Sequence, residues 1–250
     1  MKPLAIALLA LPLASFAQSA DTPAWRAALV TEHSNLSRGY ADWNAVSLQL
    51  GRHWSRRELA EVELTETRRF GQSDSEVAAG GAFPLGDALT ASLRATYSPT
   101  HRVLPRASLG GGLQYEFRPA WLLHGALRTT RYAATDVDQA SVMLEHYFGN
   151  WSALGAVHAI RAFGQDTQAY ELRGSYYYGD ASSVGLIAST GREVTQLGAG
   201  ALAFARVHSL ALVGRHALDG RWSLRYGLHR VRQGDFYTRS GVTLGVQAAF

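Results

Sequence analysis

A set of charged and histidine side chains lies in segments where polar and apolar residues alternate, and these residues are the best placed to do chemistry. Both signs of charge are present, so neighbouring segments can bring a carboxylate close to a guanidinium. Such residues either pair with one another and fill an interior, or line a narrow wet passage whose field orients polar solutes. This interior set comprises Glu61, Glu63, Arg94, Glu116, His124, Arg128, Glu145, Glu171, Arg173, Arg225 and His229.

Nucleophilic catalysis finds little support in the sequence. The Gly-x-Ser-x-Gly turn that exposes a catalytic serine is absent. On a strand, Ser141 and His146 point to opposite faces because an odd number of positions separates them, so they cannot meet without a bulge. Since no serine has a positioned base, we expect a protein that is not an enzyme.

A metal site is not indicated either. The nine histidines are scattered, and no His-x-His or His-Glu-x-x-His spacing brings two of them together. Four acids in polar stretches could bind Ca²⁺ or the cations that bridge lipopolysaccharide, but their spacing favours solvated loop residues. We therefore expect no metal and no cofactor. The four acids are Asp74, Asp136, Asp138 and Asp235.

Segments of strict period-two alternation must position the interior set, and the last one is the clearest. Its apolar face consists of Val242, Leu244, Val246, Ala248 and Phe250, while polar or small residues occupy the other face. This pattern is typical of a strand with lipid on one side and water on the other. The aromatic residue in the apolar register resembles the C-terminal signature by which outer-membrane barrels are recognised for assembly.

Turn pairs such as Gly149-Asn150 and Asp219-Gly220 separate these segments and alternate with longer polar stretches. We therefore predict an all-β fold, a single closed antiparallel transmembrane β-barrel with short periplasmic turns and moderately short extracellular loops that stay outside the interior. About 14 strands are expected, and the alanine-rich stretch from Gly191 to Ala217 leaves 12 as the alternative. The strands are predicted at 25–34, 43–54, 58–69, 76–85, 88–97, 106–117, 121–131, 138–148, 151–162, 168–178, 183–191, 206–217, 221–232 and 239–250.

Composition agrees with this fold. The mean hydropathy of −0.09 would also suit a soluble β-sandwich, but barrel strands average to such a value because lipid-facing and water-facing residues alternate. A sandwich would need a charged outer face, whereas the second face here is mixed and rich in glycine. Cysteine is absent, so disulfides do not stabilise the fold. The net charge of +4 forms no basic stripe, which argues against nucleic acid as a partner.

The first residues predict export. Lys2, the apolar run Leu4–Ala14 and the small-x-small sequence Ser15-Phe16-Ala17 indicate a cleaved signal peptide at residues 1–17. We expect a periplasmic segment at 18–24 and the barrel at 25–250. The destination is the outer membrane of a Gram-negative cell, where the partners are outer-membrane lipids and lipopolysaccharide. Assembly would require the barrel-assembly machinery and periplasmic chaperones.

Several stretches spread in order over most of the chain carry a family resemblance. They are Thr67–Asp74, Leu104–Gly112, Glu145–Trp151, Tyr176–Asp180 with Gly191–Glu193, and the closing run Arg232–Phe250. Together they resemble the YaiO family of outer-membrane β-barrels. The resemblance implies an outer-membrane location and a single barrel domain, and it brings no activity or catalytic residues that could be carried over.

The functional expectation is a channel-like conduit for small polar or saccharide solutes, or the outer-membrane component of an envelope or exopolysaccharide system. Eight strands leave no pore and sixteen leave an aqueous channel, so about fourteen strands indicate a narrow passage. Tyr147, Tyr177, Phe236 and Tyr237 could stack on sugar rings. The alternatives are a structural or adhesion barrel with a plugged lumen, and an outer-membrane enzyme that modifies lipid or lipopolysaccharide.

Overall fold

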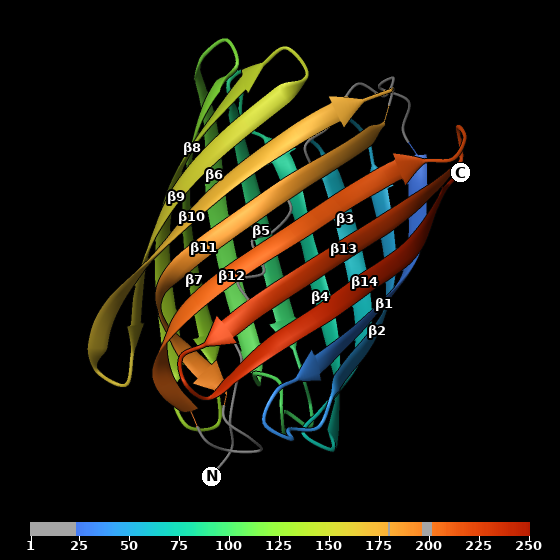
Figure 1. Ribbon diagram of the computed structural model, residues 1–250. Helices are drawn as coiled ribbons and strands as arrows, with labels where there is room; N and C mark the ends of the chain where they lie inside the picture. Colours follow the sequence, from blue (N-terminus) through green and yellow to red (C-terminus); the bar gives the residue numbers. More distant parts are fainter. Residues whose placement is uncertain (1–23, 180, 197–201) are drawn as a thin grey trace.

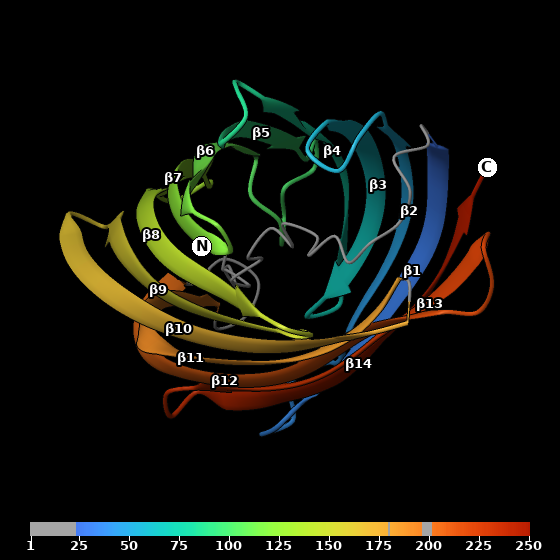
Figure 2. The same ribbon diagram turned by 90° about the horizontal axis from the view of Figure 1, so that it is seen from above.

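Fourteen antiparallel strands close into one barrel in the computed structural model, which describes residues 24–179, 181–196 and 202–250 (Figures 1 and 2). Each strand pairs with its neighbours in the sequence, and β1 (Ala24–Leu36) pairs with β14 (Tyr237–Ala249) to close the ring. The predicted signal peptide and residues 18–23 lie outside the described residues. Ala24, predicted as periplasmic, already belongs to β1. The predicted fold and the count of 14 strands are confirmed.

The strands are long enough to span a membrane at a tilt, since about 9–11 residues suffice. Within the described residues, no helix is long and apolar enough to span a membrane. The other strands are β2 Trp43–His53, β3 Leu59–Arg69, β4 Gln72–Pro84, β5 Leu89–Tyr97, β6 Ala107–Arg118, β7 Trp121–Arg131, β8 Asp136–Phe148, β9 Trp151–Ala162, β10 Gln165–Tyr178, β11 Ser182–Gln196, β12 Leu202–Ala217 and β13 Trp222–Gln233.

Alternation sorts the side chains of each strand between the two faces of the wall. In β7, Leu127 is 70% exposed on the outer face, while His124, an inward residue of the same strand, is 2% exposed. Leucine, valine and aromatic side chains cover the outer face of the other strands in the same way. An apolar exterior around a polar interior is the arrangement of an outer-membrane barrel.

The loops at one end are shorter than predicted. The segments 70–75 and 163–167, which lie between predicted strands, contain only two-residue turns, Phe70-Gly71 and Phe163-Gly164. All four turn residues have positive φ angles between 49° and 75°. Two consecutive positive φ angles match the twist of a tight hairpin, although phenylalanine rarely adopts them. Packing stabilises Phe70, whose ring lies 5.3 Å from that of Trp43. β4 therefore starts at Gln72, four residues before its predicted start.

Asp74 illustrates the consequence, because it is an inward residue of β4 and only 1% exposed, not the solvated loop acid that we predicted. Its Oδ2 accepts backbone hydrogen bonds from Val103 and from Leu104 (2.9 Å), and Oδ1 lies 3.5 Å from Nε of Arg102. The β5–β6 loop, residues 98–106, is therefore anchored to the inner wall, and Figure 2 shows this connection turned into the ring. The expectation that the loops stay outside the interior is wrong for this loop.

Apolar packing at the same end of the barrel forms what we call the aromatic cluster. Leu36, Trp43 and Tyr237 are buried there, and Tyr40, Phe70 and Phe236 pack against them. Tyr237 is 2% exposed, so it presents no face to a sugar, contrary to the expectation for this residue. The cluster narrows the sector of the mouth between β1 and β3.

Candidate functional site

The structure places the interior set on the inward side of β3, β5, β6, β7, β8, β10 and β13. Its members alternate with the exposed outer leucines and valines of these strands. Glu116 lies at the rim: the β6–β7 register shifts between Glu116 and Arg118, and Glu116 Oε1 accepts a hydrogen bond from the Ala120 amide (3.2 Å). Glu116 therefore caps a short turn, and the other members line the wall.

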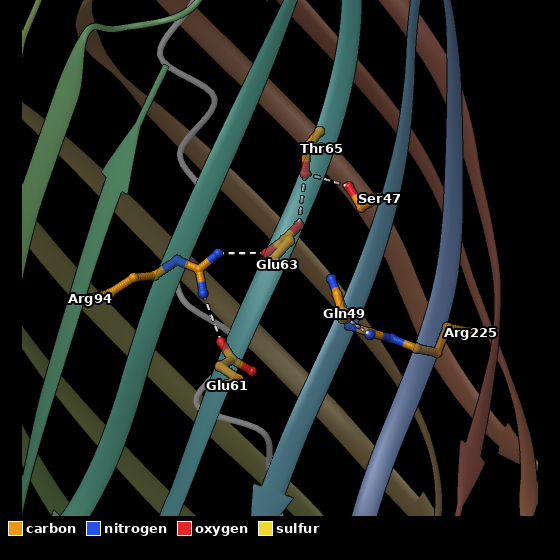
Figure 3. A network of polar contacts seen from close by, with 7 residues as sticks. All are labelled: Ser47, Gln49, Glu61, Glu63, Thr65, Arg94 and Arg225. Carbon is orange, nitrogen blue, oxygen red and sulfur yellow. Dashed lines mark hydrogen bonds and ion pairs between the residues drawn. The ribbon is translucent and has the colours of Figure 1, made fainter. Parts of the chain in front are cut away.

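Arg94 on β5 forms the centre of the best-defined polar network (Figure 3). Its Nη1 lies 2.7 Å from Oε1 of Glu61, and its Nη2 lies 2.5 Å from Oε2 of Glu63. β4 lies between β3, which carries both glutamates, and β5. The β4 residue beside Arg94 is Gly80, so no side chain obstructs the guanidinium. The guanidinium thus bridges two carboxylates, and charge-assisted contacts of this kind are strong and directional.

This network continues onto the neighbouring strand β2, and part of it is exposed to the lumen. Thr65 donates a hydrogen bond to Glu63 (3.3 Å) and shares one with Ser47 (2.8 Å). The side chain of Glu61 is 41% exposed although it is ion-paired within the ring. The inner wall is therefore accessible to solvent at Glu61, two residues from the start of β3.

The strands β7 to β10 carry a second group of contacts. His124 Nε2 lies 3.3 Å from Oε2 of Glu145, and Arg173 Nη2 lies 2.9 Å from Oε1 of Glu171. Both pairs are more buried than the Arg94 network, because the Glu171 side chain is only 4% exposed. Acids and bases are thus matched locally on this wall as well.

The interior set omits several inward ionisable residues. Their signal was the same alternation. Most of them fall near predicted strand ends or in the stretch whose facing was ambiguous from sequence, whereas His158 lies well inside β9. One group surrounds Glu32, whose Oε1 lies 3.4 Å from Nη1 of Arg239 and 3.9 Å from Nε2 of His229. The omitted residues are Arg26, Glu32, His53, Arg69, Asp74, Glu76, His158, Glu193, Arg215 and Arg239.

Ser141 meets a histidine that sequence reasoning did not consider. His146 lies on the outer face, where its ring stacks on Trp121 at 3.9 Å, so Ser141 and His146 are apart as predicted. Ser141 Oγ instead lies 2.8 Å from Nδ1 of His158 on β9. His158 Nε2 is buried and has no hydrogen-bond partner among the described residues, so no carboxylate orients the imidazole as in a catalytic triad.

Among the other acids predicted in loops, Asp235 lies in the β13–β14 turn, 3.6 Å from Arg232. The loop prediction is wrong for Asp136 and Asp138, which belong to β8, and Asp136 lies 3.5 Å from Arg131. In the part of the chain that the structure describes, no three His, Cys, Asp or Glu side chains gather closely enough to hold a metal ion.

The outer face of β14 carries the apolar residues of the predicted assembly signature. Val242, Leu244 and Val246 are 43–52% exposed on this face. Beyond the strand, the Phe250 amide donates to the Trp25 carbonyl (2.9 Å), and the Trp25 amide donates to the Phe250 carbonyl (2.8 Å). The seam of the ring therefore extends to the last residue of the strand region.

Comparisons with known proteins agree with this architecture. The family profile described as "YaiO membrane beta barrel domain" matches residues 26–196. No curated protein matches the sequence. Among solved structures, the COG4313 outer membrane channel from Pseudomonas putida F1 is 12% identical, with a TM-score of 0.60 over 95% of this chain and 98% of that one.

Two further structures are similar. The outer membrane protein Omp33 of Acinetobacter baumannii is 10% identical, with a TM-score of 0.56 over 91% of this chain and 99% of that one. A bacterial polysaccharide outer membrane secretin is 11% identical, with a TM-score of 0.56 over 93% of this chain and all (100%) of that one. At such identities, the likeness shows a shared fold.

Proposed function

This outer-membrane chain belongs to the YaiO family of membrane β-barrels, and on that premise we propose that it is a narrow, water-filled, non-enzymatic conduit for small polar solutes. One observation carries the proposal: the Glu61 side chain is 41% exposed inside the ring while it pairs with Arg94. A dry, plugged core would bury such a carboxylate, at a large cost in desolvation. Similar folds among outer-membrane channels are consistent with this role.

The distribution of charge supports passage of polar molecules. Acids and arginines occupy different sectors of the wall, with Glu61 and Glu63 on β3 and Arg215 and Arg225 on β12 and β13, so a solute in the lumen experiences a transverse field that orients its dipole. Saccharides fit this interior, because Tyr147 and Tyr177 stack at 6.1 Å on the inner wall and a hydrogen bond joins the Tyr177 hydroxyl to Ser152 (3.1 Å). A place in an envelope or exopolysaccharide system is part of the same proposal.

The second candidate is a structural barrel whose lumen is closed. The observation that favours it is the inward loop 98–106, in which Val103 is fully buried and Asp74 anchors the backbone. This loop and the aromatic cluster both narrow the same end of the barrel.

Single-channel recording in planar bilayers separates the two candidates. We expect ohmic steps from the purified, refolded mature protein. Arg94→Gln leaves Glu61 and Glu63 without their cation, so selectivity should shift towards K⁺. A change of about one kT in local potential shifts K⁺ and Cl⁻ in opposite directions by about threefold each, so the permeability ratio would change about sevenfold.

Arg230→Gln is the matched control, because it removes the same charge from the outer face of β13. Its selectivity should equal that of the wild type. Folded protein that gives no conductance step at any voltage would refute the conduit and favour the closed barrel.

A further inference from the structure

Three arginines gather on the inner wall at the short-turn end of the barrel. Arg215 on β12 and Arg225 on β13 are direct cross-strand partners, and Arg26 lies on β1, beyond β14. Arg215 interacts electrostatically with both of the others, and His53 on β2 interacts with Arg26 and Arg215. We call Arg26, Arg215 and Arg225 the cationic cluster.

Like charges directly opposite each other on neighbouring strands are destabilising, so the cationic cluster needs a counter-charge. Among the described residues, no carboxylate forms an ion pair with any of its three arginines. The acids of β3 are engaged elsewhere, because Glu61 and Glu63 both bind Arg94. The positive charge of the cationic cluster is therefore not compensated by any carboxylate in the described ranges of the chain.

The guanidinium groups also have free donors. Nε of Arg26 and Nε of Arg215 are buried and have no hydrogen-bond partner among the described residues. Arg225 donates through Nη1 to Oε1 of Gln49 at 2.7 Å, which extends its side chain along the inner wall over β14 and β1 (Figure 3). An arginine carries five N–H donors, so most of the donors in the cluster stay available.

The inward residues of β14 between the arginines are mostly small. They are Gly245 beside Arg225, Ala249 beside Arg26, and Gln247 between these two positions. Gly245 and Ala249 carry no side chain long enough to come between the guanidinium groups, and the Gln247 amide offers further N–H donors. Several planar donor groups around one space match the geometry of a tetrahedral oxyanion, which arginine binds in a bidentate manner.

We propose that the cationic cluster binds a phosphate group, free or carried by a small solute, at the short-turn end of the lumen. The inference deepens the proposed function and rests on it only for the role in transport, because binding itself needs no conduction. A phosphate site at this end would make the conduit prefer phosphorylated or otherwise anionic polar solutes.

Thermal unfolding of the full mature chain in detergent tests the site. We compare sodium phosphate with sodium chloride at equal ionic strength, because a ligand of the folded state lowers the unfolding constant by the factor 1 + [L]/Kd. At a phosphate concentration of ten times the Kd, this factor is about 11. Arg215→Gln and Arg225→Gln should each abolish the phosphate-dependent rise in Tm without lowering Tm in chloride, since each substitution relieves repulsion.

Arg128→Gln is the matched control, because it removes an arginine from a distant part of the inner wall that instead donates to Ser108 (3.2 Å). It should keep the full phosphate effect. If Arg215→Gln does not refold, Arg215→Lys, which keeps the charge but loses the bidentate fork, should show a weaker phosphate effect. A second comparison measures Tm with glucose 1-phosphate and with glucose. If both the ester and inorganic phosphate raise Tm, the site accepts a phosphate group carried by a solute. If only inorganic phosphate raises Tm, the site binds the free anion.

An equal rise in Tm for the wild type, Arg215→Gln and Arg225→Gln would overturn the inference, and so would no rise in the wild type. The result that would refute the conduit differs from the result that would refute the phosphate site. Conductance steps together with equal phosphate effects would retain the conduit and remove the site. A phosphate effect that the substitutions abolish, in a protein without conductance, would retain the site and remove the conduit.

Discussion

Substitution of Asp74 should release the inward loop 98–106 and thereby widen the mouth. The Asp74 carboxylate accepts backbone hydrogen bonds from Val103 and Leu104, and Arg102 lies 3.5 Å away. Asp74→Asn keeps the shape of the side chain but removes its charge, so the perturbation is confined to these contacts.

The expected magnitude follows from the two backbone hydrogen bonds. A hydrogen bond to a charged group contributes about 1.5–3 kcal/mol, and a neutral one contributes about 0.5–1.5 kcal/mol. Loss of the charge on both bonds therefore costs about 2–3 kcal/mol. The Arg102 side chain is 47% exposed, so its ion pair adds little. The equilibrium for loop opening should rise roughly 30- to 150-fold.

Limited trypsin digestion measures this opening, because the loop contains Arg102 and Arg106. When opening and closing are faster than cleavage, the cleavage rate follows the population of the open loop. Cleavage of Asp74→Asn after Arg102 should accelerate by the same factor, and single-channel conductance should increase. Asp166→Asn is the control, since it removes an exposed carboxylate that pairs with Arg161 on the β9–β10 hairpin. Cleavage of folded Asp74→Asn at the wild-type rate would refute the anchoring role of Asp74.

Two further predictions concern the barrel itself. Trp43→Ala should destabilise the protein by about 3–5 kcal/mol, measured by urea unfolding in lipid vesicles. The reason is that Trp43 is 3% exposed, packs in the aromatic cluster, and has the guanidinium groups of Arg69 and Arg239 over its ring at 4.7 and 4.9 Å. A loss of stability below about 1 kcal/mol would contradict this packing role. Leu127→Arg should cost about 2–4 kcal/mol in the same assay, because Leu127 is an outer residue that faces lipid, and Thr129→Arg, two residues nearer the rim, should cost less. Equal losses of stability for Leu127→Arg and Thr129→Arg would argue against a position of Leu127 deeper in the membrane than Thr129.

The sequence was sufficient for the fold because one rule, the alternation of side chains, decides facing along each strand. Leu127 and Arg128 fall on the outer and inner faces as their residue types require. The ends of the strands were less predictable. Phe70-Gly71 forms a tight turn only because Phe70 packs against residues of the β1–β2 region, and such tertiary packing overrides local turn preferences.

Within the candidate site, facing was predictable but pairing was not. Arg94 reaches Glu61 and Glu63 across β4, and this contact depends on the register of three strands and on the glycine between them. Arg215 was missed because its segment had ambiguous facing, and its like-charged partner Arg225 gave no hint of a cluster. Side-chain alternation specifies a face, whereas a binding site depends on which strands become neighbours.

The seam between β1 and β14 also decides when the ring can close. Trp25 and Phe250 exchange backbone hydrogen bonds although they lie at opposite ends of the described chain. A sheet without β14 would leave β1 and β13 each with an unpaired edge on which another chain could add a strand. The barrel is therefore protected from edge-to-edge association only when its final strand docks beside its first.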